Sequence, residues 1–243
     1  MENSCREKYK PSSKKWILAS KRTGFRRNSA LIPANAGLFH YAGNNTIRYI
    51  DPDGRFEVDK KSRYEFKLHC LEALTYLSHS NTADKIINSL KDVDFTIYEV
   101  MFINEYEGDN YNPNSNTLGW NSKASPLAKN GNANSPSILL IHELVHAYID
   151  KTEDGKLLFQ EWQKHNIAKI EKVKKLYPEV NFDNKDEYER WLNEECTTWL
   201  ESIIADELKE PKGRRYYKDV QRSSKGVIIL FNFSNPTQFY EDK

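Results

Sequence analysis

Apolar side chains recur at helical spacing in several stretches of this 243-residue chain. A period near 3.6 residues places such side chains on one face of a helix. The central stretch has Ser135 in position to cap it and Pro136 in its first turn, and Pro211 and Gly213 end the last stretch. The predicted helices cover residues 64–77, 83–90, 136–148, 157–176 and 186–204.

Alternation of apolar and polar residues, rich in β-forming side chains, predicts strands in other parts of the chain. One strand covers residues 95–103 and a return strand covers residues 117–121, with a turn at residues 111–116 between them. A late strand is expected at residues 227–233. Strands before the central helix and helices after it predict an α+β fold, with a small β-sheet and a mainly helical C-terminal lobe.

Composition limits the classes of protein to which the chain can belong. No apolar run approaches the roughly 20 residues that a membrane-spanning helix needs, and the N-terminus lacks the apolar stretch of a secretory signal. Three scattered cysteines indicate neither a disulfide framework nor a cysteine-rich zinc site. We therefore expect one soluble domain with an N-terminal extension and no membrane span.

Charge is distributed unevenly along the chain. Residues 1–30 hold nine basic and two acidic side chains, a net charge of +7 against +1 for the whole chain. Such an arm can contact nucleic acid or an anionic membrane surface, but few aromatic side chains alternate with these charges. We therefore prefer to interpret residues 1–36 as a basic, disordered leader and expect no nucleic-acid partner.

The central helix carries the motif His142-Glu143-Leu144-Val145-His146. His142 and His146 are four residues apart, so both imidazoles project from one face of the helix, about one turn from each other. That separation suits two nitrogen ligands of one tetrahedral zinc ion. Glu143 lies beside the pair, where its carboxylate can take a proton from a water molecule activated by the metal. The motif therefore predicts one Zn²⁺ per chain.

An amphipathic helix with two satisfied histidines and a surface glutamate is the alternative interpretation of this motif. It is disfavoured because two imidazoles and a carboxylate among isoleucine and leucine side chains need polar or charged partners. The remaining histidines lack paired spacing and are interpreted as surface or packing residues: His40, His69, His79 and His165.

A third protein ligand has to come from another part of the chain. The best candidates are Glu194 and Glu195, in the last predicted helix. Two adjacent glutamates are costly to bury without a cation, and one of them facing zinc would offset that cost. A solvated glutamate pair on a charged helix face is the alternative. We favour ligation, because a site with two histidines and one carboxylate needs such a helix downstream.

The motif at residues 142–146, followed by Glu194-Glu195-Cys196-Thr197-Thr198, resembles the gluzincin pattern of secreted bacterial toxins. The chain is similar to NleD-like effector zinc metallopeptidases and, more distantly, to the light chains of clostridial neurotoxins. In the neurotoxins the first glutamate of Glu-Glu-x-x-Thr is the third zinc ligand, which corresponds to Glu194. Glu195 and Thr198 then lie behind the ligand or act as alternative ligands. The resemblance covers about residues 60–240 and implies a zincin-like metalloendopeptidase of unspecified substrate.

Residues 37–56 resemble the end of an Rhs (YD-repeat) core, with Asn44-Asn45 and Pro52-Asp53-Gly54 as turn formers around a short strand. Thr46 stands where members of that family usually have proline. In Rhs proteins this motif precedes a variable toxin. The resemblance therefore implies a carrier remnant at residues 37–56 and a metallopeptidase domain at residues 57–243, while an ordinary hairpin in a linker is the alternative.

A basic and aromatic cluster follows the last predicted helix at residues 212–218. Peptide hydrolysis builds negative charge on a tetrahedral oxygen, and a cation or a phenol aimed there lowers the barrier. Clostridial light chains use an Arg-x-x-Tyr pair for this work, and Arg214 and Tyr217 have that spacing. A solvated basic loop is the alternative.

We also expect a strand that binds the substrate. In zincins an edge strand just before the metal helix pairs with an extended peptide. Thr117, Leu118, Gly119 and Trp120 precede the central helix, and Gly119 would permit close approach of a second backbone. A plain hairpin strand packed by Trp120 is the alternative.

These motifs predict a zinc metalloendopeptidase, and the resemblances imply that it acts as a bacterial effector or toxin domain on a protein substrate. We expect export by a specialised system, activity in the cytosol of a target cell, and a cognate immunity protein or carrier shell as further partners. Two other interpretations stay open. One is a non-catalytic Rhs-associated carrier or binding fragment with a structural HExxH helix, and the other is zinc-dependent hydrolysis of a bond other than a peptide.

Overall fold

The structure, a computed structural model, describes residues 56–101, 110–176, 181–211, 213, 220–221 and 230–241. It divides the chain into two units, Met1–Gly37 and Leu38–Lys243, and all described residues belong to the second unit. The expected basic leader lies outside the described residues, as does the expected Rhs-like motif apart from Phe56.

The larger sheet contains four strands in the spatial order β1-β2-β4-β3. β1 (Phe56–Val58), β2 (Phe95–Glu99) and β4 (Thr117–Trp120) are parallel, and β3 (Asn110–Asn112) runs antiparallel to β4. The predicted strands at residues 95–103 and 117–121 are confirmed as β2 and β4, although β2 ends at Glu99. The alternation in β2 buries Phe95 and Ile97, as the period of two residues requires.

The connection between β2 and β4 differs from the prediction. Residues 111–116 were expected to form a turn, but Asn110–Asn112 is itself a strand and the turn follows it. Asn116 has a left-handed backbone with φ of 49°, which asparagine tolerates better than most residues. The hairpin therefore joins β3 to β4, and the pairing of β4 with β2 is parallel.

Two helices follow β1. The predicted helix at residues 64–77 is confirmed as α2 (Tyr64–Leu77), which buries Phe66, Cys70 and Leu74. α3 (Asn81–Ser89) begins earlier than predicted because Ser80 caps it, accepting a hydrogen bond from the backbone N–H of Ala83 at 3.0 Å.

The central helix is α4 (Pro136–Lys151), with Ser135 at its N-cap position as predicted. The single helix predicted over residues 157–176 is wrong, because the chain forms α5 (Glu153–His165) and α6 (Ile167–Leu176). Asn166 interrupts them, since its side-chain amide donates back to the carbonyl oxygen of Trp162 at 2.8 Å. The close approach of α5 to the end of α4 needs Gly155 in the first turn of α5, where a Cβ would lie 2.0 Å from the carbonyl oxygen of Tyr148.

The last long helix is α7 (Lys185–Glu207), which confirms the helix predicted over residues 186–204. Asn184 caps it by accepting hydrogen bonds from the backbone N–H groups of Asp186 and Glu187. A second sheet pairs β5 (Ala124–Pro126), which the sequence pattern did not predict, with β6 (Leu230–Asn232) in antiparallel orientation. The predicted late strand thus lies at residues 230–232, and residues 227–229 are outside the described part.

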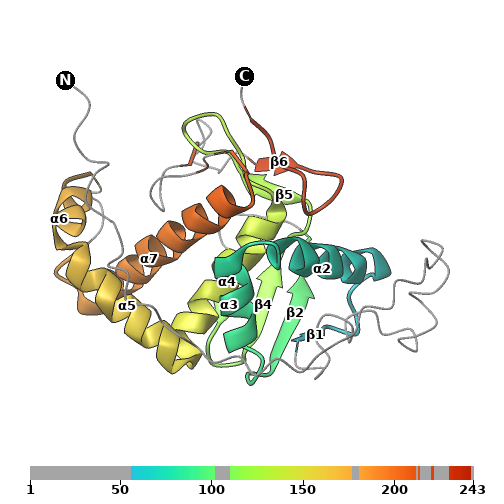
Figure 1. Ribbon diagram of the computed structural model, residues 1–243, viewed down its shortest axis with the longest axis horizontal. Helices are drawn as coiled ribbons and strands as arrows, with labels where there is room; N and C mark the ends of the chain where they lie inside the picture. Colours follow the sequence, from blue (N-terminus) through green and yellow to red (C-terminus); the bar gives the residue numbers. More distant parts are fainter. Residues whose placement is uncertain are drawn as a thin grey trace, which may run out of the picture. The chain divides into compact units, whose positions relative to one another are not determined.

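Helix α4 lies between the larger sheet and α7 (Figure 1). Several apolar side chains of α4 and of the central strands are fully buried: Ile138, Leu140, Ile141, Leu144, Val145, Ile97 and Leu118. A sheet on one side of the helix and helices on the other make the fold mixed α+β, as predicted, and compatible with a zincin-like fold.

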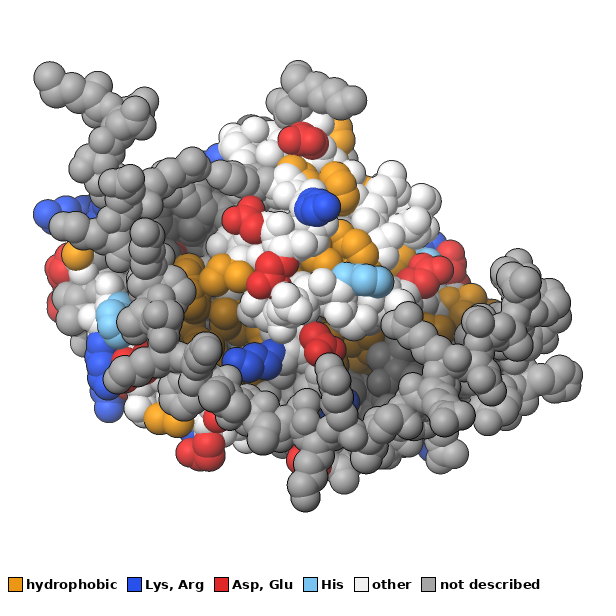
Figure 2. Space-filling view, viewed as in Figure 1, with side chains coloured by type: hydrophobic (Ala, Val, Ile, Leu, Met, Phe, Trp, Pro, Cys, Tyr) orange, Lys and Arg blue, Asp and Glu red, His pale blue; other side chains and the backbone are white. Residues whose placement is uncertain are grey.

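The surface seen from the side of Figure 1 carries interspersed acidic and basic side chains, with hydrophobic side chains between them (Figure 2). Within the described residues, no helix combines the length and the apolar character that crossing a membrane requires.

Candidate metal centre

Helix α4 holds His142 and His146 one turn apart, with their Nε2 atoms 3.2 Å from each other. The two ring centroids are 4.8 Å apart and the ring planes are nearly perpendicular, at 83°. The spacing predicted from the sequence therefore produces two imidazoles that converge on one point beside the helix.

Helix α7 brings Glu194 to the same point. Its Oε2 atom lies 3.3 Å from Nε2 of His142 and 3.4 Å from Nε2 of His146. We call His142, His146 and Glu194 the metal trio. Among the described residues, this is the group of histidine, cysteine and acidic side chains that could hold a metal ion.

The spacing within the metal trio fits a tetrahedral zinc ion. With bonds of about 2.0–2.1 Å, neighbouring ligand atoms of such an ion are about 3.3–3.4 Å apart. The three distances in the trio are 3.2, 3.3 and 3.4 Å. The side chains of His146 and Glu194 remain 16% and 20% exposed, so the site opens toward solvent, as a catalytic zinc site requires.

The other nitrogen of each imidazole faces a hydrogen-bond acceptor. Nδ1 of His142 donates to Oε2 of Glu201 at 2.9 Å, and Nδ1 of His146 donates to Oδ1 of Asn193 at 2.6 Å. A proton on Nδ1 leaves the lone pair on Nε2. Two nitrogen lone pairs and a carboxylate oxygen then point at one another, an arrangement that a bound cation stabilises.

The electrostatics of Glu194 agree with this arrangement. Burial raises the pKa of its carboxyl, but the contacts with His142 and His146 outweigh burial and hold that pKa well below its usual range. Glu194 is therefore an ionised, partly buried ligand candidate rather than a neutral carboxylic acid.

Sequence reasoning missed three residues of α7 that contact the imidazoles: Glu201, Asn193 and Thr197. Glu201 is 4% exposed and lies two turns after Glu194 on the same side of the helix. Thr197 Oγ1 lies 3.4 Å from both Nδ1 of His146 and Oδ1 of Asn193. The spacing of Thr197 and Glu201 from Glu194 was a usable signal, because residues at i+3 and i+7 share a helix face with residue i. Asn193 directly precedes Glu194, and its spacing gave no such signal.

Glu195 and Thr198, expected behind the ligand or in its place, are both buried at 1% exposure. Neither belongs to the metal trio, which takes its carboxylate from Glu194. Glu143, next to His142 on α4, is also buried, at 7% exposure. The predicted acidic residues thus lie on the two helices that form the site: Glu143 on α4, and Glu194 and Glu195 on α7.

The expected substrate strand needs a correction. β4 pairs with β2 along Thr117–Trp120 and with β3 along residues 117–119, so it is an interior strand of the sheet and not an edge. A Cβ on Gly119 would lie 2.6 Å from the hydroxyl oxygen of Tyr98, which already covers this glycine. The expectation of an edge at β4 is wrong because the preceding residues form β3, the edge strand on that side among the described residues.

The alternative interpretation of β4, a packed strand, agrees with the structure. Leu118 and Trp120 are fully buried. Nε1 of Trp120 donates to the carbonyl oxygen of Pro136 at 2.9 Å, which ties the end of β4 to the first residue of α4. β4 therefore supports the helix that carries the histidines.

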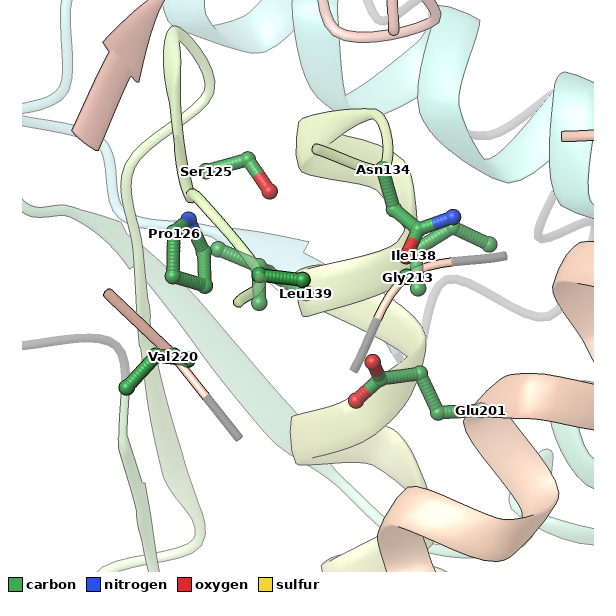
Figure 3. Close-up of a pocket in the computed structure, with 9 residues that line it drawn as sticks. Ser125, Pro126, Asn134, Ile138, Leu139, Glu201, Gly213 and Val220 are labelled. Atoms are coloured by element: carbon green, nitrogen blue, oxygen red, sulfur yellow. The ribbon is translucent and has the colours of Figure 1, made fainter. Parts of the chain in front are cut away.

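A pocket lies beside Glu201, between α4 and the chain that follows α7 (Figure 3). Its lining includes Ile138 and Leu139 of α4, together with Gly213 and Val220. Ile138 precedes His142 by one helical turn, so the pocket adjoins the metal trio.

The predicted stabilisers of negative charge, Arg214 and Tyr217, lie outside the described residues. Gly213 precedes them in the chain and Val220 follows them, and both of these described residues line the pocket beside Glu201.

Comparison with known proteins identifies one matching family. The model of the peptidase M91 family, described as an effector protein, matches residues 53–196, which include α4 and Glu194. No curated protein and no solved structure matches the chain. Because the match covers more than half of the sequence, the chain belongs to the peptidase M91 family of effector proteins.

Proposed function

We propose that this chain is a zinc-dependent metalloendopeptidase that acts as a bacterial effector or toxin domain. The observation that carries the proposal is the metal trio, in which two imidazole nitrogens and one carboxylate oxygen lie 3.2–3.4 Å apart. His142, His146 and Glu194 would hold one zinc ion per chain. Membership of a peptidase family supports hydrolysis of a peptide bond.

The reaction divides between the ion and the side chains around it. A bound zinc ion would polarise the substrate carbonyl and lower the pKa of water to about 7. Glu143 would accept a proton from the attacking water and deliver it to the leaving amine. Its place next to His142, on a buried helix with little freedom to move, suits a general base.

The hydrogen bonds from α7 would orient the ligands. Glu201 and Asn193 accept from Nδ1 of the two imidazoles and keep each Nε2 lone pair directed into the site. Glu195 and Thr198 would support Glu194 from within the buried part of α7. Arg214 or Tyr217 would donate to the oxygen that becomes negative as the peptide bond is attacked.

The setting of the reaction follows from the family and from the Rhs-like motif. An effector peptidase acts on a protein of a target cell, so we propose a protein substrate and activity in the target-cell cytosol. The motif at residues 37–56 supports delivery by a specialised export system, with a carrier shell or a cognate immunity protein as further partners.

The proposal is tested by metal analysis and by proteomics. The purified protein should contain one zinc per chain, and Glu143→Gln should retain that zinc because the glutamine is not a ligand. Lysates treated with wild-type protein should contain new protein N-termini that Glu143→Gln produces at least ~100-fold more slowly. Protein that binds no stoichiometric metal would support the alternative of a non-catalytic fragment. Zinc without new N-termini would point to a bond other than a peptide.

A further inference from the structure

The start of α4 is stabilised in an unusual way. Ser135 occupies the N-cap position, but its side chain makes no capping hydrogen bond to the helix, and the first turn contains no acidic residue. Its hydroxyl instead donates to Oε1 of Glu210 at 2.6 Å. The acidic side chain at this helix N-terminus therefore comes from the chain that follows α7.

Glu210 accepts hydrogen bonds from three residues: Asn134 and Ser135 in the segment before α4, and Tyr76 in α2. Oε1 accepts from the hydroxyls of Ser135 and Tyr76, and Oε2 accepts from the backbone N–H of Ser135 at 2.8 Å and from Nδ2 of Asn134 at 3.1 Å. The side chain is buried, with 5% of the residue exposed. Burial raises the pKa of Glu210, and the hydrogen bonds from Ser135, Asn134 and Tyr76 oppose that shift.

A second contact holds the same two segments together. Nδ2 of Asn134 also donates to the carbonyl oxygen of Pro211 at 3.0 Å. A Cβ on Gly213 would lie 1.7 Å from Oδ1 of Asn134, so the backbone after α7 closely approaches the residue before Ser135. The segment just before α4 is thus attached to the segment just after α7.

This attachment belongs to a series of contacts along two antiparallel helices. Glu210 contacts Ser135, Glu201 contacts His142, and Asn193 contacts His146. A shift of α4 along its axis would change all of these contacts and also the separation of both histidines from Glu194. Because bond lengths in metal sites are held within about 0.2 Å, even a small shift would weaken the ligand set.

We propose that Glu210 is a positioning residue of the metal centre. It sets the axial position of α4 against α7, and so the distance of His142 and His146 from Glu194, although it touches none of them. The inference rests on the proposed function, because it assumes that the trio binds a metal ion.

The chain offers a matched control at Glu207. This carboxylate accepts hydrogen bonds from the Ser80 hydroxyl at 2.5 Å, the Thr82 backbone N–H at 2.9 Å and the Thr82 hydroxyl at 2.8 Å. It lies at the same end of α7 as Glu210 and makes similar bonds, but its partners belong to the start of α3. Loss of Glu207 removes comparable bonds without releasing the start of α4.

The experiment compares Glu210→Ala, Glu210→Gln and Glu207→Ala as full-length proteins, well below their melting temperatures. Zinc affinity is measured by competition with a chelator, and the d–d absorption of added cobalt(II) reports the geometry of the site. We expect Glu210→Ala to weaken zinc about tenfold and to change the cobalt spectrum. Glu210→Gln should stay close to wild type, because its oxygen accepts from Ser135 and Asn134 while its amide donates to the two hydroxyls. Glu207→Ala should lower the melting temperature but leave the zinc affinity and the cobalt spectrum unchanged.

Equal zinc affinities and equal cobalt spectra for Glu210→Ala and Glu207→Ala would overturn the inference. Wild-type protein that binds neither zinc nor cobalt would instead overturn the proposed function. If Glu210→Ala does not fold, Ser135→Ala removes only the hydroxyl bond and should still weaken zinc by about twofold to threefold. An unchanged affinity in Ser135→Ala, with Glu210→Ala unfolded, would assign Glu210 a role in folding alone.

Discussion

The two helices that form the metal centre contribute to it in different ways. On α4 the two histidines are neighbours in sequence, and the helical repeat alone places them one turn apart. On α7 the acceptor Asn193, the ligand candidate Glu194 and the acceptor Glu201 reach the histidines only because that helix packs against α4. The positions of the histidines are therefore set by local helix geometry, whereas the positions of the α7 residues are set by tertiary packing.

This difference predicts how substitutions on each helix would affect metal binding. Loss of a local ligand removes a metal bond from a helix that is otherwise intact. Loss of a residue on α7 can act in two ways, because it can remove a bond to the metal or allow the two helices to shift. The predictions below separate these effects, from the largest to the smallest.

The largest effect is expected from removal of a ligand. His146→Ala or His142→Ala should abolish stoichiometric zinc, since a single imidazole and a carboxylate bind too weakly to retain it. Glu194→Ala should also lose zinc, and more severely than Glu195→Ala, because only Glu194 lies in the metal trio. The zinc content of each variant after dialysis measures these losses. Zinc lost from Glu195→Ala but kept in Glu194→Ala would move the ligand by one residue.

The next effect concerns turnover without metal loss. Arg214→Ala or Tyr217→Phe should lower kcat by about 10–1000-fold, because a donor to the developing oxyanion acts only in the transition state. Zinc affinity should not change. Steady-state kinetics on a cleaved peptide, with zinc content measured in parallel, check this. Wild-type kcat in both variants would make Arg215 and Tyr216 the next candidates.

A smaller effect is expected from the residues that orient the imidazoles. Glu201→Ala should weaken zinc by about 10–100-fold, because Nδ1 of His142 loses its buried acceptor. Glu201→Gln retains an acceptor oxygen and should lie nearer to wild type. Asp206→Ala, on the exposed side of the same helix, serves as the control and should bind zinc normally. If Glu201→Ala and Asp206→Ala behave alike, the contact does not support the metal.

The smallest effect is on stability at acid pH. Burial raises the pKa of Glu207, but the hydrogen bonds from Ser80 and Thr82 outweigh it and hold the pKa below its ordinary value of 4.5. A carboxyl with a depressed pKa in the fold stabilises the protein above pH 4.5 and loses that contribution as the pH falls through its folded pKa. The melting temperatures of wild type and Glu207→Gln should therefore differ at pH 7 and converge toward pH 3. A difference that stays constant with pH would contradict this.

Several elements could be predicted because their patterns are strong. α2, α4 and α7 have long apolar stripes, and β2 alternates cleanly. β3 was missed because residues 111 and 112 were assigned to the predicted turn, although pairing with β4 makes the segment a strand. The break at Asn166 was missed because apolar residues continue at helical spacing on both sides of it.

The pairing of the expected substrate strand could not be predicted from the sequence either. The sequence places residues 117–120 just before α4, but it contains no information on which strands become neighbours in the sheet. Pairing of β4 with both β2 and β3 is a property of the assembled sheet. The glycine that suggested an open edge is instead required by the side chain of Tyr98.

The sequence by itself determined the relative placement of His142, Glu143 and His146, because they lie within one and a half turns of one helix, where local geometry suffices. Together with the resemblance to the neurotoxins, it also favoured Glu194 over Glu195 as the third ligand candidate. Only the tertiary structure placed the Glu194 carboxylate beside the two imidazoles, and only it brought Glu201 and Glu210 to α4. The physical reason is that a helix repeats every 3.6 residues whatever surrounds it, whereas the rotation and axial position of one helix against another depend on packing across the whole core.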